Sequence, residues 1–197
     1  LHLLDDASIT VYFTGDEENA ANPKTISRGD FIIRAKQHDV ALAFETATSM
    51  NIVAAARRGS SNWKLEVEGK QAHSSGVFGA AGYGAIYEAA RIVNGFREKL
   101  STQPFLTFNP GLFVGGSDVN YTSASQTGEA VGKNNIVSPK AVVIGDLRFL
   151  SEEQKINARD TMRQIVAQHL PGTNAVISFT DGIPAMPPAE GNLALAK

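Results

Sequence analysis

The sequence has no cysteine, no long apolar run and no marked excess of either charge. Its 197 residues include 18 Lys+Arg and 20 Asp+Glu, for a formal net charge of -2. Without cysteine the chain has no disulfide, no thiolate zinc ligand and no cysteine nucleophile, so any zinc must be bound by His, Asp or Glu. The near-neutral charge argues against a nucleic-acid partner, and no apolar run approaches the ~18 residues that a membrane span requires.

What is present is the composition of a globular protein that can bury a core. Hydrophobic residues make up 43% and charged residues 19%, which is typical of folded domains rather than disordered chains. The length fits one ample domain or two modest ones. Residues 1–6 read as the tail of a helix and 192–197 as the beginning of another. We therefore expect the chain to be an internal piece of a longer protein.

The first part of the chain has the pattern of a fragment of an α/β sheet. Residues 8–14 are β-branched and aromatic, which predicts a buried strand. A helix is predicted over 27–37, with Ser27 as N-cap and Asp30 at the capping-box position. Two short apolar runs follow, at 40–44 and 52–56. The order strand, helix, strand favours part of a layered α/β domain.

The second part, after a polar joint at 57–61, predicts a complete small domain. Residues 63–68 alternate as Trp-Lys-Leu-Glu-Val-Glu, a strand with Trp63, Leu65 and Val67 facing inward. The further predicted elements are a helix at 83–100, strands at 106–114 and 141–150, a helix at 151–169 and a strand at 175–179. The order β-α-β-β-α-β over 61–183 is the ferredoxin-like arrangement. It predicts one antiparallel sheet with both helices on one face, leaving the other face or an edge free for a partner.

Acidic residues follow the predicted strands of the first part. Glu17 and Glu18 come directly after a glycine turn, and Glu45 closes the next apolar run. In an open α/β sheet such positions lie at the carboxyl edge, where sites are usually built. One carboxylate can bind a cation while its neighbour moves a proton on metal-bound water. Acids on loops are also commonly just solvated, so this pattern alone leaves both interpretations open.

The run 11–18, Val-Tyr-Phe-Thr-Gly-Asp-Glu-Glu, resembles the metal-site segment of metallopeptidase family 20. That family includes glutamate carboxypeptidases, acetylornithine deacetylase and succinyl-diaminopimelate desuccinylase. Three further segments follow in the family's order. Gly-Lys-Gln-Ala-His-Ser at 69–74 resembles G-K-x-x-H-S/A, Asn-Ile-Val-Ser-Pro at 135–139 resembles N-x-I-P, and Asp-Leu-Arg at 146–148 resembles D-x-R. Each segment is weak alone, but their order and spacing over the whole chain are specific.

The resemblance implies a fold class, α/β (α+β), and a division of the chain. Residues 1–59 would be part of a zinc-hydrolase catalytic domain, 60–184 a ferredoxin-like dimerisation domain, and 185–197 a segment returning to the catalytic domain. It also implies a homodimer through 60–184. The intact enzyme would be an exopeptidase or amidohydrolase that cleaves an amide bond next to a free carboxylate, in a peptide or an N-acyl amino acid.

The resemblance further implies two zinc ions and a role for each acid. Glu17 would be the general base that deprotonates a zinc-bridging water, while Glu18 would bind one zinc and Glu45 the other. The family's site also needs a His-x-Asp, a bridging Asp and a late His, which this chain lacks. We therefore expect one ligand per zinc at most and no activity from this chain alone. Asp39 is a reserve ligand, because the spacing from Glu18 to Glu45 is slightly generous.

Substrate contacts are implied for three residues of the second part. His73 would reach the partner subunit's site and stabilise the developing oxyanion. Asn135 and Arg148 would hold the substrate, with Arg148 gripping its free carboxylate through a bidentate contact. Because Ser138 is inserted before the expected proline, Asn120 and Asn134 stay open as alternatives to Asn135.

Two other functions are kept as alternatives. The chain could be a non-catalytic ferredoxin-like module whose free edge makes a dimer. It could also be a ferredoxin-like RNA binder or a small-ligand regulatory domain. Against RNA binding, the predicted strands lack the paired aromatic residues of a base-stacking platform.

Overall fold

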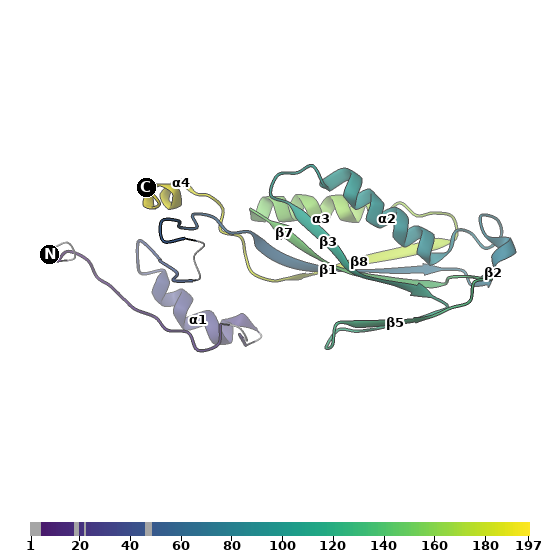
Figure 1. Cartoon of the computed structure of the whole chain (residues 1–197), viewed down its shortest axis with the longest axis horizontal. Helices are drawn as coiled ribbons and strands as arrows, with labels where there is room; N and C mark the ends of the chain where they lie inside the picture. The colour runs from purple at the N-terminus through teal and green to yellow at the C-terminus, as the bar shows by residue number, and fades with distance from the viewer. Residues whose placement is uncertain (1–4, 18–19, 22, 46–48) are drawn as a thin grey trace. The chain divides into compact units, whose positions relative to one another are not determined.

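The computed structural model describes residues 5–17, 20–21, 23–45 and 49–197, and the chain divides into two compact units, Leu1–Ile52 and Val53–Lys197 (Figure 1). The described part of the first unit contains one helix, α1 (Lys24–Ala35). The second unit contains, in chain order, β1 (Gly59–Gly69), β2 (Ala72–His73), a 3-10 helix η1 (Ser74–Gly76), α2 (Gly84–Leu100), β3 (Thr107–Gly116), β4 (Asp118–Thr122), β5 (Thr127–Val131), β6 (Ile136–Val137), β7 (Lys140–Phe149), α3 (Glu152–Val166), β8 (Thr173–Asp181) and α4 (Glu190–Leu195).

Four strands of the second unit form one antiparallel sheet in the order β3-β7-β1-β8. Helices α2 and α3 lie together on one face of it (Figure 1). The predicted β-α-β-β-α-β arrangement is confirmed. The chain enters β1 and leaves β8 at the same end, where Arg57 and Met186 exchange backbone hydrogen bonds of 2.8 and 2.9 Å.

The core lies between the sheet and its two helices. Alternate residues of β1 from Trp63 to Val67 are buried, as the alternation predicts. The Trp63 ring meets Phe96 of α2 edge to face at 5.7 Å, and Met162 of α3 is fully buried beside this layer. Each large apolar side chain buried here contributes roughly 1.5–3 kcal/mol. The opposite face of the sheet carries the even-numbered residues of β1 and β7, and we call it the open face.

Helix α3 begins where its capping residues predict. The Ser151 hydroxyl accepts a hydrogen bond from the Gln154 backbone N–H at 3.1 Å. The Gln154 side chain in turn accepts one from the Leu150 N–H at 2.8 Å, so an orphan donor of the first helical turn and the backbone N–H just before the cap are both satisfied. The helix ends at Val166, three residues earlier than predicted.

The hairpin of β4 and β5 is the main element of the second unit that the sequence interpretation missed. It extends over the side of the sheet away from the helices (Figure 1). A Cβ built on Gly128 would lie 2.9 Å from the Leu112 side chain, so the hairpin packs closely on β3. Its turn gives no glycine signal, because Gln126 supplies the left-handed backbone with φ of 55°.

The first unit departs from the predicted pattern. Helix α1 begins after Pro23, not at Ser27, and Asp30 is not a capping residue because its carboxylate accepts from Tyr12 and Arg34. The predicted strands at 8–14 and 40–44, and the one at 52–56 that runs into the second unit, are wrong: no residue of these runs forms a β-ladder with another described residue. A strand needs a neighbour to satisfy its backbone groups, and β-propensity alone does not supply one.

Apolar side chains of the first unit therefore remain at the surface. Phe13 is 90% exposed and Phe44 is 95% exposed, where the sequence predicted buried strands. None of the described helices is long and apolar enough to cross a membrane.

Candidate functional site

One end of the second unit brings two of the predicted site residues together. His73 lies on β2 directly opposite Ile136 of β6. The next residue, Ser74, donates its backbone N–H to the Asn135 carbonyl oxygen at 2.9 Å. Both His73 and Asn135 are exposed. A two-residue ladder thus holds the imidazole next to the segment that carries the predicted substrate amide.

Hydrogen bonds define which nitrogen of His73 can act. Its Nδ1 accepts the Ser75 backbone N–H at 3.2 Å and lies 2.9 Å from the Ser75 hydroxyl. Because a backbone N–H can only donate, Nδ1 is the acceptor and the neutral ring carries its proton on Nε2. No described residue accepts from Nε2. The imidazole is therefore arranged to donate a hydrogen bond outward.

Arg148 lies on the open face near the other end of β7. It stands between Ser60 of β1 and Thr107 of β3 in the register of the sheet. Its Nε donates to the Asp146 carboxylate at 2.9 Å. Neither terminal nitrogen meets an acceptor among the described residues. Asp146 therefore fixes the guanidinium and leaves its outer nitrogens free for a ligand.

Arg58 is a candidate that the sequence interpretation missed, because it was taken as part of a polar joint. Its Nη1 donates to the Thr107 hydroxyl at 3.0 Å, and Thr107 is the cross-strand neighbour of Arg148. No carboxylate of the described residues pairs with Arg58. Its position two residues before Ser60, on the parity of β1 that faces outward, is the signal that would have found it. The cationic side chains Arg58 and Arg148 thus both have Thr107 as a neighbour.

The pair His73 and Asn135 lies next to the Lys140 end of β7, whereas Arg148 lies near the Phe149 end, so one chain holds them at opposite ends of that strand. Figure 1 shows β2 at the end of the sheet away from the one where the chain enters β1 and leaves β8. The eight residue steps of β7 from Lys140, next to β6, to Arg148 correspond to roughly 26 Å at ~3.3 Å per residue. The sequence interpretation placed Asn135 and Arg148 on one substrate. A single copy does not bring them together, so a shared substrate requires one of them from each of two copies.

The first unit does not assemble a metal site in the part that is described. Glu17 and Glu45 are both exposed, and Glu18 lies outside the described residues. Over 5–17, 20–21, 23–45 and 49–197, no group of three His, Cys, Asp or Glu side chains could hold a metal ion. Because zinc in proteins takes three or four protein ligands, these residues by themselves do not fit it. The reserve ligand Asp39 brings in no third donor.

The structure shows where the three candidate substrate asparagines lie. Asn120 lies in the β4–β5 hairpin opposite Glu129 and is not part of the β2–β6 ladder. Asn134 and Asn135 are both exposed next to β6, and the contact to Ser74 comes from the backbone of Asn135. Asn135 stays the predicted residue, with Asn134 and Asn120 as its alternatives.

Comparison with protein families gives a match within the second unit. The profile of the M20 peptidase dimerisation domain matches residues 55–174, more than half of the chain. The chain belongs to this family. The dimerisation domain matched in this way contains the whole β1-to-α3 part of the sheet and helices, together with His73, Asn135 and Arg148. The predicted family resemblance is confirmed.

Solved structures share the fold at low sequence identity. A tripeptidase from Staphylococcus aureus subsp. aureus mu50 is 20% identical with a TM-score of 0.59, covering 86% of this chain and 44% of that chain. A hydantoinase/carbamoylase family amidase from Burkholderia ambifaria is 15% identical with a TM-score of 0.50, covering 70% and 31%. The chain thus spans less than half the length of either. No curated protein matches the sequence significantly.

Proposed function

We propose that this chain forms part of a hydrolase that cleaves an amide bond next to a free carboxylate, in a peptide or an N-acyl amino acid. The observation that carries the proposal is the pair Arg58 and Arg148. Both lie on the open face beside Thr107, and the terminal nitrogens of Arg148 have no partner among the described residues. A forked guanidinium of this kind matches the geometry of a carboxylate.

His73 supports the hydrolase half of the proposal. Its Nε2–H is free to donate to the oxyanion that forms when an amide carbonyl is attacked. In the proposed enzyme His73 and Asn135 act on the substrate held by Arg148 of the partner copy, because the two groups lie too far apart in one chain. Glu17 is the proposed general base.

A second copy of this chain is the proposed partner. An apolar groove of about 420 Å³ runs between α2 and the edge strand β3, lined by residues that include Val93, Phe108 and Phe113. Phe113 is 41% exposed there. Burial of this groove against its symmetric counterpart would build a two-fold interface in which each copy covers the other's apolar edge. The family match to a dimerisation domain supports this assignment.

The variant Arg148→Ala tests the proposed binding of the substrate carboxylate by Arg148, which we call the carboxylate grip. We expect this variant to weaken binding of N-acetyl-L-alanine by about tenfold to a hundredfold, because a charge-assisted bidentate contact contributes roughly 1.5–3 kcal/mol. Titration calorimetry with the 197-residue chain measures it. Arg148→Lys keeps the charge without the fork and should recover only part of the loss. Unchanged affinity of Arg148→Ala would contradict the proposal.

Two zinc ions belong to the proposal through the residue resemblance alone, with Glu18 and Glu45 as one ligand each. We expect elemental analysis to find about two zinc ions per chain in the full-length protein, as in two-metal hydrolases, and none in the 197-residue chain. Glu45→Ala should lower the content, whereas Asp39→Ala should not. A full-length protein that stays metal-free after zinc is supplied would refute the zinc assignment.

The alternative is a non-catalytic dimerisation module. The family match covers 55–174 alone, and the described residues assemble no metal cluster, which favours this alternative for the isolated chain. A module of this kind would dimerise but would not bind N-acetyl-L-alanine in an Arg148-dependent way.

A further inference from the structure

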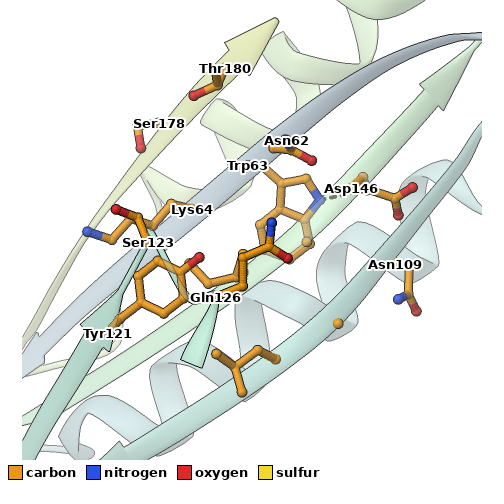
Figure 2. A pocket seen from close by; sticks show the side chains of 14 residues that line it. Asn62, Trp63, Lys64, Asn109, Tyr121, Ser123, Gln126, Asp146, Ser178 and Thr180 are labelled. Atoms are coloured by element: carbon orange, nitrogen blue, oxygen red, sulfur yellow. Dashed lines mark hydrogen bonds between the residues drawn. The ribbon is translucent and has the colours of Figure 1, made fainter. Parts of the chain in front are cut away.

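A hollow of about 530 Å³ lies between the open face of the sheet and the tip of the β4–β5 hairpin (Figure 2). Its floor comes from all four strands of the sheet. Its wall comes from Tyr121, Ser123 and Gln126 of the hairpin. The missed hairpin therefore converts a flat sheet face into a cavity.

The floor of the hollow contains a row of four polar side chains across the sheet. Cross-strand register places Asn109 of β3 opposite Asp146 of β7, Asp146 opposite Asn62 of β1, and Asn62 opposite Thr180 of β8. Neighbours in such a row have Cβ atoms about 4.5–5.5 Å apart. The row therefore presents two carboxamides, a carboxylate and a hydroxyl to one ligand.

This row lies next to the carboxylate grip of the proposed function. Arg148 is two residues beyond Asp146 on the same face of β7, a step of about 7 Å along the strand. Asp146 itself joins the two, because it lines the hollow and accepts from Arg148 Nε. The step is comparable to the distance between the α-carboxylate and the end of the side chain in a glutamine-sized amino acid.

Most hydrogen-bonding groups of the hollow have no partner within the described protein. The side chains without such a hydrogen bond are Asn62, Asn109, Tyr121, Ser123, Gln126, Ser178 and Thr180. The charged groups, in contrast, are already paired: Lys64 with Glu66 at 2.7 Å and Asp146 with Arg148 at 2.9 Å. The hollow thus offers neutral donors and acceptors but no unpaired charge.

We propose that the hollow binds the side chain of the amino acid whose carboxylate Arg148 holds, and that this side chain is neutral and hydrogen-bonding, a carboxamide or a hydroxyl. The inference rests on the proposed function and deepens it. An aliphatic side chain would displace water from these amides and hydroxyls without replacing its hydrogen bonds. A charged side chain would lose its water shell there without an unpaired counter-charge in the lining of the hollow.

The test compares two ligands that differ only in this side chain. Trp63 is the sole tryptophan of the chain. Its ring is buried in the core beneath the floor of the hollow, which it helps to line, and its Nε1–H donates to the Asp146 carbonyl at 2.9 Å. Its fluorescence is therefore the readout of binding. We expect the 197-residue chain to bind N-acetyl-L-glutamine about fivefold to tenfold more tightly than N-acetyl-L-alanine, the effect of one or two added hydrogen bonds.

Variants on the open face locate the effect. Asn62→Ala should abolish the preference for the glutamine ligand, so that the two ligands bind with similar affinity. Asn174→Ala is the matched control, since Asn174 is an exposed residue of β8 opposite Glu68, outside the hollow. It should keep the preference. Circular dichroism confirms that both variants are folded.

The outcomes separate this inference from the proposed function. If the alanine ligand binds in an Arg148-dependent way and the glutamine ligand binds no better, the hollow assignment is overturned and the carboxylate grip stands. A preference for glutamine that survives Asn62→Ala also overturns the hollow assignment. If neither ligand binds, the carboxylate grip fails and the hollow assignment with it.

Discussion

Replacing Glu88 with alanine is expected to lower the free energy of unfolding by about 3 kcal/mol, because it leaves a largely buried cation without its anion. The Glu88 side chain is fully buried on α2. Its two oxygens accept from Arg91 Nε and Nη2 at 2.8 and 2.7 Å, and one also accepts from the Leu170 backbone N–H at 3.2 Å. Arg91 donates further to the Ile165 and Gln168 carbonyls.

This network fastens the end of α3 to α2, so its loss should affect the whole second unit. Urea unfolding followed by Trp63 fluorescence measures the change. Glu98→Ala is the matched control: Glu98 lies on the same helix, and its contacts with Arg97 and Asn94 are exposed. Its loss should cost about 0.5 kcal/mol or less. Equal losses for the two variants would show that the Glu88 network contributes nothing beyond a surface pair.

The same carboxylate gives the stability a defined pH dependence. Burial raises the pKa of Glu88, but the hydrogen bonds from Arg91 and the Leu170 N–H outweigh burial and leave the pKa below its usual value. The folded state therefore binds this proton less readily than the unfolded state. Its contribution is fully present above the unfolded pKa, about 4.3, and is lost as the pH falls through the folded value. Glu88→Gln should weaken this acid dependence.

The sequence predicted the second unit well because its signals are local. The alternation around Trp63 and the cap at Ser151 each determine one element from neighbouring residues alone. The arrangement of these elements follows from a connection pattern that few folds satisfy. The β4–β5 hairpin was not predicted, because its turn has Gln126 in the left-handed conformation instead of the glycine or asparagine that usually marks such a turn.

The strands predicted in the first unit failed for a different reason. An apolar run such as 8–14 predicts a strand only if another segment pairs with it, and pairing is a property of the fold rather than of the run. The candidate site shows the same limit. Sequence order places Asn135 and Arg148 in one predicted domain, yet it carries no information on the length of sheet between them. Arg58 was taken as part of a polar joint, because its contact with Thr107 is distant in sequence and only its outward-facing parity marked it.

The separation of Asn135 from Arg148 along the sheet leads to the prediction with the largest effect on activity. In the full-length protein, Glu17→Gln and His73→Ala should each lower turnover at least about a hundredfold, as loss of a general base or of an oxyanion donor does. Mixed in equal amounts, the two inactive variants should regain about a quarter of wild-type activity. Random exchange puts half of the chains in mixed two-fold dimers, and each mixed dimer has one site with both residues intact.

Recovery on mixing depends on the proposed dimer surface, which supplies the control. Adding Phe113→Asp to both variants places a charge in the groove between α2 and β3 and should abolish the recovery. Adding Ile156→Asp, at a 54% exposed apolar residue of α3 outside that groove, should leave it intact. Mixtures no more active than their components would mean that His73 does not act across the dimer. Because Asn135 and Arg148 lie at opposite ends of the sheet in one chain, that result would also mean that the two residues do not bind the same substrate molecule.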